Sequence, residues 1–259
     1  VTILYPKGKV SDIQEKQLTT LGKNVKALEI DGTFDDCQTL VKRAFLDEEL
    51  KGRFSLASAN SINIARLIPQ SFYYVAAYAT LKKLGKKVVF SVPSGNFGNL
   101  TAGLLAFKMG MPVKTFIAAT NVNKVVPEYL ASGIYTPISP SKSTISNAMD
   151  VGNPSNFPRM KALFGSSLEV IKEHIVGYFY NDDQTRIGIK ELFSEYNYLT
   201  CPHSAIGYLA LKDYFKETSD TESIGIFLST AHFAKFLPEM ESTLGFTPEI
   251  PDRLSNLLE

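Results

Sequence analysis

The chain has 259 residues, of which 44% are hydrophobic and 20% charged, and its formal net charge is +1. This composition is typical of a globular protein with a sizeable core, and the scattered basic residues argue against nucleic acid as a main partner. No apolar run reaches the length of a membrane span and no signal peptide is visible, so we expect a cytoplasmic protein without a membrane partner. Cys37, Cys201 and the three histidines lack metal-ligand spacing, so no metal is expected.

Strand-like and helical patterns alternate in the first 58 residues. Strands are predicted at 2–5, 25–30 and 55–58, and helices at 12–21 and about 34–50. Ser11 is a suitable N-cap for the first helix, and Leu40, Val41, Ala44 and Phe45 are expected on the buried face of the second. One helix between successive strands implies parallel pairing with right-handed crossovers.

The same alternation continues to the C-terminus. Strands are predicted at 88–92, 114–119, 176–180 and 223–228, and helices at 70–84, 100–109, 123–130, 157–164, about 182–196 and 204–215. Residues 135–156 form a long polar stretch without clear periodicity, which is typical of a functional loop. We therefore expect an α/β protein with a mainly parallel sheet flanked by helices.

The segment 88–107 combines a buried strand, a glycine-rich loop and a helix. Pro93 ends strand pairing because it has no backbone N–H, and small polar residues with two glycines fill positions 94–99. Free N–H groups of such a loop converge at the helix N-terminus, where the partial positive charge suits a phosphate dianion. The alternative is a turn whose Ser, Gly and Asn residues only cap the helix.

Polar residues follow three of the expected strands, after Ser58, Val92 and Leu228. In parallel sheets ligands bind beyond the carboxyl ends of the strands, so these three polar segments are expected to gather at one end of the sheet.

Short motifs lie at 4–11, 14–17, 58–63, 93–98, 118–121, 146–150 and 230–232. Together they resemble threonine synthase of the bacterial and fungal type, and the similarity runs over nearly the whole chain. The resemblance implies a fold-type-II, tryptophan synthase β-like enzyme that uses pyridoxal 5′-phosphate to convert O-phospho-L-homoserine and water to L-threonine and phosphate. It also implies that residues 1–58 complete a smaller domain and that residues 59–259 form most of a larger cofactor-binding domain.

The resemblance also implies residue roles. The cofactor phosphate is expected against the loop formed by Ser94, Gly95, Asn96, Phe97, Gly98 and Asn99. Thr230, or Ser229 as second choice, is expected at the pyridine nitrogen, and the alternative for Thr230 is a helix-capping role. Substrate contacts are expected from Asn60, Ser61, Asn63, Lys142, Asn153, Ser155, Asn156 and Arg159. The first three are expected either at the substrate carboxylate or facing the cofactor ring. The alternative for Arg159 is an ordinary surface salt bridge.

One departure concerns the lysine that binds the cofactor covalently in the family. Its Ser-Phe-Lys-Asp type motif does not occur here, and Lys7 and Lys9 belong to another motif. We expect that lysine upstream of Val1, and we therefore expect residues 1–259 alone to be inactive. We also expect a monomer or a weak homo-oligomer. The alternatives are a non-catalytic module that binds a phosphate ligand and another fold-type-II lyase, such as a serine or threonine dehydratase.

Overall fold

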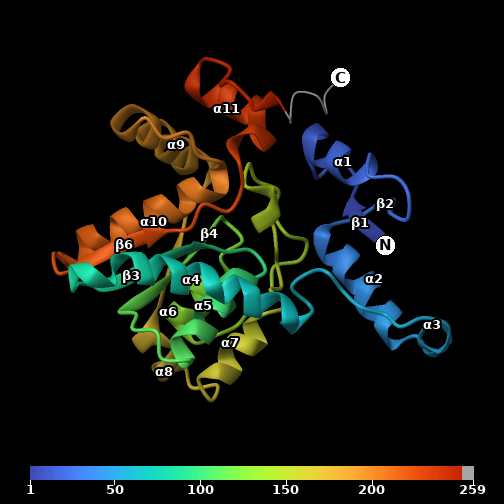
Figure 1. The fold of residues 1–259 in the computed structure, drawn as a ribbon, viewed down its shortest axis with the longest axis horizontal. Helices are drawn as coiled ribbons and strands as arrows, with labels where there is room; N and C mark the ends of the chain where they lie inside the picture. The colour runs from blue at the N-terminus through green and yellow to red at the C-terminus, as the bar shows by residue number, and fades with distance from the viewer. Residues whose placement is uncertain (253–259) are drawn as a thin grey trace.

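Two separate parallel sheets organise residues 1–252, the part of the chain that the computed structural model describes (Figure 1). The smaller sheet pairs β1 (Thr2–Pro6) with β2 (Lys26–Ile30). The larger sheet has the strand order β5-β4-β3-β6. The sequence-based expectation of an α/β fold with parallel strands and flanking helices is confirmed.

The smaller sheet is accompanied by α1 (Asp12–Thr19), α2 (Phe34–Leu46) and α3 (Glu48–Arg53). Ser11 caps α1 as expected, with its side chain accepting from the Gln14 N–H, and Thr33 caps α2 in the same way through Asp36. In both caps the side chain at the third helical position also accepts from the backbone N–H of the capping residue. The caps thus satisfy backbone donors that would otherwise have no partner at the start of each helix.

Three predictions for this region are wrong. The single helix expected at about 34–50 is divided at Asp47, whose side chain caps the start of α3 by accepting from the Leu50 N–H at 2.9 Å. The strand expected at 55–58 does not form, because this extended segment finds no strand to pair with in the described chain. Helix α2 buries Cys37 and Gln38, whereas Leu40, expected on the buried face, is exposed.

The larger sheet consists of β3 (Lys87–Pro93), β4 (Thr115–Thr120), β5 (Ile175–Phe179) and β6 (Ser223–Phe227), all parallel. Side chains alternate between its two faces, as strand geometry requires. Phe90 and Phe116 enter the core on one face, whereas Val89 and Ile117 enter the core on the other. The central strands β3 and β4 are therefore apolar on both faces, which is typical of a parallel sheet covered by helices.

Helices cover both faces of the larger sheet (Figure 1). The core on the Phe90 face includes residues of α4 (Leu67–Leu81), α5 (Gly98–Lys108), α6 (Val125–Ser132), α7 (Phe157–Leu163) and α8 (Leu168–His174). The opposite face packs against α10 (Pro202–Thr218), which in turn contacts α9 (Asp182–Tyr196). Helix α11 (Leu237–Leu244) then packs on α9. The sequence analysis did not predict α8.

Four short 3-10 helices complete the described elements: η1 (Ile64–Arg66), η2 (Lys82–Leu84), η3 (Asn147–Met149) and η4 (Phe233–Phe236). The long loop expected at 135–156 is present, and η3 is its only helical turn. Within residues 1–252, no helix combines the length and the apolar character needed to cross a membrane.

Candidate functional site

A cleft of about 640 Å³ opens beyond the carboxyl ends of β3 and β6. Most of the residues that line it come from the loop after β3 and the start of α5, from η3, from the start of α10 and from the segment after β6, and α1 and α4 also contribute. They include Gly95, Asn99, Ala148, His203, Ser229 and Thr230. The sequence analysis placed a ligand at this end of the sheet. The structure brings the polar segments that follow β3 and β6 to the same cleft.

Backbone donors form one wall of the cleft, at the start of α5. Helix α5 begins at Gly98 directly after Phe97, which has a left-handed φ of 61°, and no side chain caps it. The N–H groups of the first helical turn have no partner within the helix, and Asn99, one of these residues, lines the cleft. An uncapped N-terminus with partial positive charge is suited to an anion.

The two glycines of this loop are required by close packing. A Cβ at position 95 would lie 2.7 Å from the Met149 Cα and 2.8 Å from the Ala148 carbonyl oxygen. A Cβ at position 98 would lie 2.9 Å from the Ser61 Cβ. The loop therefore sits directly against η3 on one side and against the segment around Ser61 on the other.

Side chains of the loop are largely engaged inside the protein. The Ser94 hydroxyl donates to the Val92 carbonyl at 2.8 Å, and the Ser94 N–H donates to the Ala119 carbonyl at 2.8 Å. The Asn99 side-chain oxygen accepts from the Tyr74 hydroxyl at 2.9 Å. The donors left for a ligand are therefore mainly backbone N–H groups, together with the Asn99 amide.

Hydroxyl groups lie in another part of the cleft, after β6. The Thr230 N–H donates to the buried Ser204 Oγ at 3.1 Å, and the Tyr198 hydroxyl donates to Ser229 Oγ at 3.4 Å. Within residues 1–252, the Thr230 hydroxyl itself has no hydrogen-bond partner. This arrangement fixes the backbone while leaving one hydroxyl available to a ligand.

His203 is a cleft residue to which the sequence analysis assigned no role. It is buried near the start of α10, and its Nε2 accepts from the Ala148 N–H at 3.2 Å. Burial lowers the pKa of His203 to about 4, with a smaller contribution from Lys235. The ring is therefore neutral near pH 7 and holds η3 in place. A lone histidine after a proline carries no pattern that would have revealed this contact.

The Asn96 side chain joins two segments that are distant in sequence. Its amide nitrogen donates to Ser61 Oγ at 2.7 Å, and its oxygen accepts from the Ser155 N–H at 2.6 Å and from Ser155 Oγ at 2.9 Å. The Asn156 side chain donates to the Asn96 carbonyl at 3.0 Å. The predicted residues Ser61, Asn96, Ser155 and Asn156 thus lie together.

Arg159 completes this cluster. Its guanidinium donates to the carbonyls of Ser61 at 2.8 Å and Ile62 at 2.5 Å, and to Asn156 Oδ1 at 2.6 Å. It also lines a hollow of about 270 Å³ with Lys42, Asn153 and Ser155. The planar guanidinium therefore braces the segment around Ser61 while facing a hollow with a second cation.

Other predicted residues make local contacts. Asn60 Oδ1 accepts from the Ile62 N–H at 2.9 Å, and Asn63 Oδ1 accepts from the Ala65 N–H at 3.0 Å, so both stabilise the turn before α4. Asn153 Oδ1 accepts from the Tyr135 hydroxyl at 2.9 Å. The Lys142 N–H donates to Asn123 Oδ1 at 2.7 Å. None of these four residues lines the cleft at Thr230.

Asp150 holds the long loop together, and the sequence analysis did not assign it a role. Its carboxylate accepts from the Thr144 hydroxyl at 2.7 Å, the Thr144 N–H at 3.0 Å and the Asn121 amide at 2.8 Å. Burial raises the pKa of Asp150 to about 6, although these hydrogen bonds oppose the shift. Asp150 is therefore a polar centre that orders the loop, next to the buried side chains of Met149 and Val151.

A sequence profile described as "Pyridoxal-phosphate dependent enzyme" matches residues 1–230. The chain belongs to the pyridoxal-phosphate-dependent enzymes. A second profile, "Threonine synthase, C-terminal", matches residues 204–259.

Solved structures and curated sequences extend the comparison for this pyridoxal-phosphate-dependent chain. It is 49% identical over 256 residues to the threonine synthase of Escherichia coli (strain K12), covering 98% of this chain and 58% of that protein. A crystal structure of threonine synthase from Escherichia coli superposes with a TM-score of 0.93 at 48% identity, covering 100% of this chain and 59% of that one. The pyridoxal-phosphate-bound threonine synthase from Brucella melitensis superposes with a TM-score of 0.85 at 35% identity, covering 99% of this chain and 60% of that one. The chain thus spans somewhat more than half the length of these relatives.

The cleft fits the cofactor that the family implies. The uncapped N-terminus of α5 supplies donors for a phosphate dianion, and a free hydroxyl at Thr230 is available for the ring. The cleft volume of about 640 Å³ lies in the range that small-molecule sites occupy.

Proposed function

We propose that the protein is a threonine synthase, which converts O-phospho-L-homoserine and water to L-threonine and phosphate with pyridoxal 5′-phosphate. The observation that carries this proposal is the 49% identity to the threonine synthase of Escherichia coli (strain K12) across 98% of this chain. The proposal concerns the whole enzyme, because the chain spans 58% of that relative.

In this proposal the loop of residues 94–99 binds the cofactor phosphate through its backbone N–H groups and the N-terminus of α5. The Thr230 hydroxyl contacts the ring nitrogen, with Ser229 as the second candidate. Pyridoxal phosphate, when bound, supplies an electron sink for carbanions formed on the substrate. The chain's own contribution is to orient the ring between these two contacts and to hold η3 against the loop through His203.

The substrate is proposed to lie toward the cluster of Asn96 and Arg159. Ser61, with Asn60 and Asn63 in the same turn, is proposed for the carboxylate. The hollow beside Arg159 is proposed for the substrate phosphate, because Lys42 adds a second cation there and a guanidinium suits phosphate geometry. Asn153 and Ser155 line the same hollow and are proposed as further contacts to this phosphate, whereas Lys142 and Asn156, the other predicted contacts, do not line it.

We also propose that residues 1–58 belong to a smaller domain and residues 59–259 to a larger one, with 253–259 lying outside the described residues. The separate two-stranded sheet supports this division. A cytoplasmic location and a monomeric or weakly self-associating state complete the proposal.

The test of the function is a direct assay of the full-length protein with pyridoxal phosphate. We expect release of inorganic phosphate from O-phospho-L-homoserine with formation of L-threonine in equal amounts. Incubation with L-serine or L-threonine, followed by assay for a 2-oxo acid, tests the dehydratase alternative. Oxo acid formation without phosphate release would contradict the proposal, and ligand binding without either product would favour the non-catalytic alternative.

A further inference from the structure

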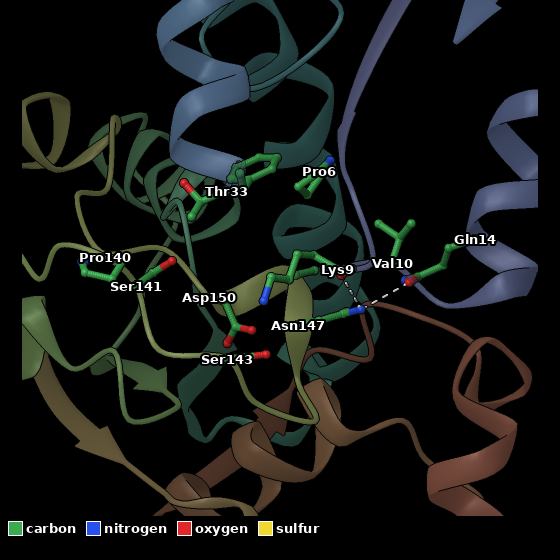
Figure 2. Close-up of a pocket in the computed structure, with 12 residues that line it drawn as sticks. Pro6, Lys9, Val10, Gln14, Thr33, Pro140, Ser141, Ser143, Asn147 and Asp150 are labelled. Atoms are coloured by element: carbon green, nitrogen blue, oxygen red, sulfur yellow. Dashed lines mark hydrogen bonds between the residues drawn. The ribbon is translucent and has the colours of Figure 1, made fainter. Parts of the chain in front are cut away.

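A second cavity, of about 370 Å³, borders η3, which also borders the cofactor cleft. Figure 2 shows its lining residues, which come from the end of β1 and the loop after it, from α1, from the start of α2 and from the loop of residues 140–150. Only Gln14 and Ala148 line both cavities. The second cavity therefore adjoins the site proposed for the cofactor but has a lining that is mostly its own.

Two opposite charges face this cavity. Lys9 is exposed, and Figure 2 shows its amine directed into the cavity toward Asp150. No salt bridge joins either residue to another side chain in residues 1–252. Asp150 is held by neutral donors only, and burial raises the pKa of this carboxyl to about 6. A partly buried carboxylate without a cationic partner is favourably placed to receive one.

A second acceptor lies close to Asp150. The Asn147 amide nitrogen donates to the Lys9 carbonyl at 3.2 Å and to Gln14 Oε1 at 3.2 Å, which fixes the orientation of the side chain. Its Oδ1 is buried and has no donor within residues 1–252. Because buried acceptors are nearly always satisfied, this oxygen also indicates that a donor is missing from this wall of the cavity.

The remaining walls limit the size and polarity of an occupant. Pro6, Val10, Phe34 and Pro140 supply apolar surface. The volume lies near the lower end of the range for small-molecule sites. A phosphate group does not fit this chemistry, because Lys9 is the only cation in the lining and Asp150 would repel a dianion.

We infer that this cavity binds a small α-amino acid with an apolar side chain, its carboxylate at Lys9, its ammonium group at Asp150 and its side chain against Val10 and Phe34. The site is independent of the proposed function, because it uses none of the residues assigned to the phosphate loop or to Thr230.

The probe for this site is L-valine, measured by isothermal titration calorimetry on the full-length protein. Isobutylamine lacks the carboxylate of valine and 3-methylbutanoate lacks its ammonium group, so each analogue removes one charge and keeps the side chain. We expect saturable binding of L-valine and at least about tenfold weaker binding of both analogues, since each loses a charge-assisted hydrogen bond. Equal affinity for the three compounds, or no saturable binding of valine, would overturn the inference.

Three variants locate the site. Lys9→Met removes the ammonium but keeps a similar stem, and we expect at least about a tenfold loss of valine affinity. Lys7→Met is the matched control, because Lys7 is an exposed lysine in the same loop that does not line the cavity, and it should leave binding unchanged. Val10→Trp fills the cavity without changing charge and should abolish binding. Full valine affinity in both Lys9→Met and Val10→Trp would overturn the assignment, as would an equal loss in Lys7→Met.

Discussion

The loop of residues 94–99 and the loop of residues 135–156 both border the cofactor cleft, but they are built differently. The shorter loop is fixed by backbone geometry and close packing, with Gly95 against η3 and Gly98 against Ser61. The longer loop is held by side-chain hydrogen bonds to Asp150 and by the Asn96 contacts with Ser155 and Asn156. The loop of residues 94–99 offers hydrogen-bond donors to a ligand, whereas the loop of residues 135–156 packs against it and fixes its position.

This difference explains why the two loops respond to different perturbations. At Gly95 and Gly98 the shorter loop tolerates no added volume, since a Cβ has no space to occupy. A side-chain network tolerates added volume at its surface but fails when one donor or acceptor is removed, because the remaining polar group is left without its partner.

The largest effect is expected from Gly95→Val, which adds volume where two backbone atoms lie within 3 Å of the new Cβ. We expect cofactor affinity to fall by about 100-fold or more, equivalent to about 2.7 kcal/mol, because the loop must move away from η3. Titration of the protein with pyridoxal phosphate, followed by absorbance, measures this change. Gly52→Ala is the matched control, since its Cβ would meet no atom within 4 Å. Unchanged affinity in Gly95→Val would show that the loop does not hold the cofactor.

The next effect concerns Arg159, which ties the segment around Ser61 to Asn156 at the end of the longer loop. Arg159→Ala removes hydrogen bonds to Ser61, Ile62 and Asn156, and we expect a loss of about 2–3 kcal/mol in the free energy of unfolding together with a raised KM for O-phospho-L-homoserine. Urea denaturation and steady-state kinetics measure the two quantities.

Arg53→Ala is the control for Arg159, because the Arg53 side chain is 65% exposed and its pair with Glu49 lies at the surface. It should change stability by less than about 1 kcal/mol. A loss of kcat with unchanged KM in Arg159→Ala would contradict a substrate contact and leave only the bracing role.

The side-chain network gives a smaller effect with a defined pH dependence. In the folded chain the pKa of Asp150 is raised from 3.8 to about 6, so the folded state binds the proton more tightly than the unfolded state. This group therefore favours folding most at low pH, and its contribution is lost as the pH rises from about 4 to about 6. His203 acts in the opposite direction, because its lowered pKa of about 4 penalises folding as the pH falls below 6.5.

Asp150→Asn separates the two titrations, since it removes the titration of residue 150 and leaves that of His203 in place. We expect the variant to be less stable by about 1–2 kcal/mol at pH 7, because an amide cannot accept at both positions that Thr144 and Asn121 occupy. The stability difference between wild type and variant should increase as the pH falls from 6 to 4. A difference that stays constant across this range would show that Asp150 keeps its ordinary pKa.

The smallest effect is expected at Thr230. Thr230→Val keeps the shape but removes the hydroxyl, and we expect cofactor affinity to fall by about tenfold, the value of one hydrogen bond of about 1.4 kcal/mol. Thr230→Ser should retain most of the affinity, which distinguishes a hydroxyl contact from a packing effect. If Thr230→Val binds as the wild type does and Ser229→Ala does not, the second candidate is the ring contact.

The sequence was most informative where structure is local. The strand, loop and helix at 88–107 could be predicted because Pro93, the glycines and the apolar runs act within a few residues, and the N-cap Ser11 was recognisable for the same reason. The strand expected at 55–58 was wrong because pairing depends on a neighbouring strand. The roles of Asp150 and His203 could not be predicted, since their partners Asn121 and Ala148 lie 29 and 55 residues away in sequence.

The central claim is that backbone donors of residues 94–99 hold the phosphate of pyridoxal 5′-phosphate, and a crystal structure of the full-length protein with the cofactor tests it most directly. We predict phosphate oxygens at about 2.7–3.2 Å from N–H groups of this loop, including the first turn of α5, with the ring nitrogen at a similar distance from the Thr230 or Ser229 hydroxyl. A phosphate bound elsewhere, with these N–H groups facing only water, would contradict the account.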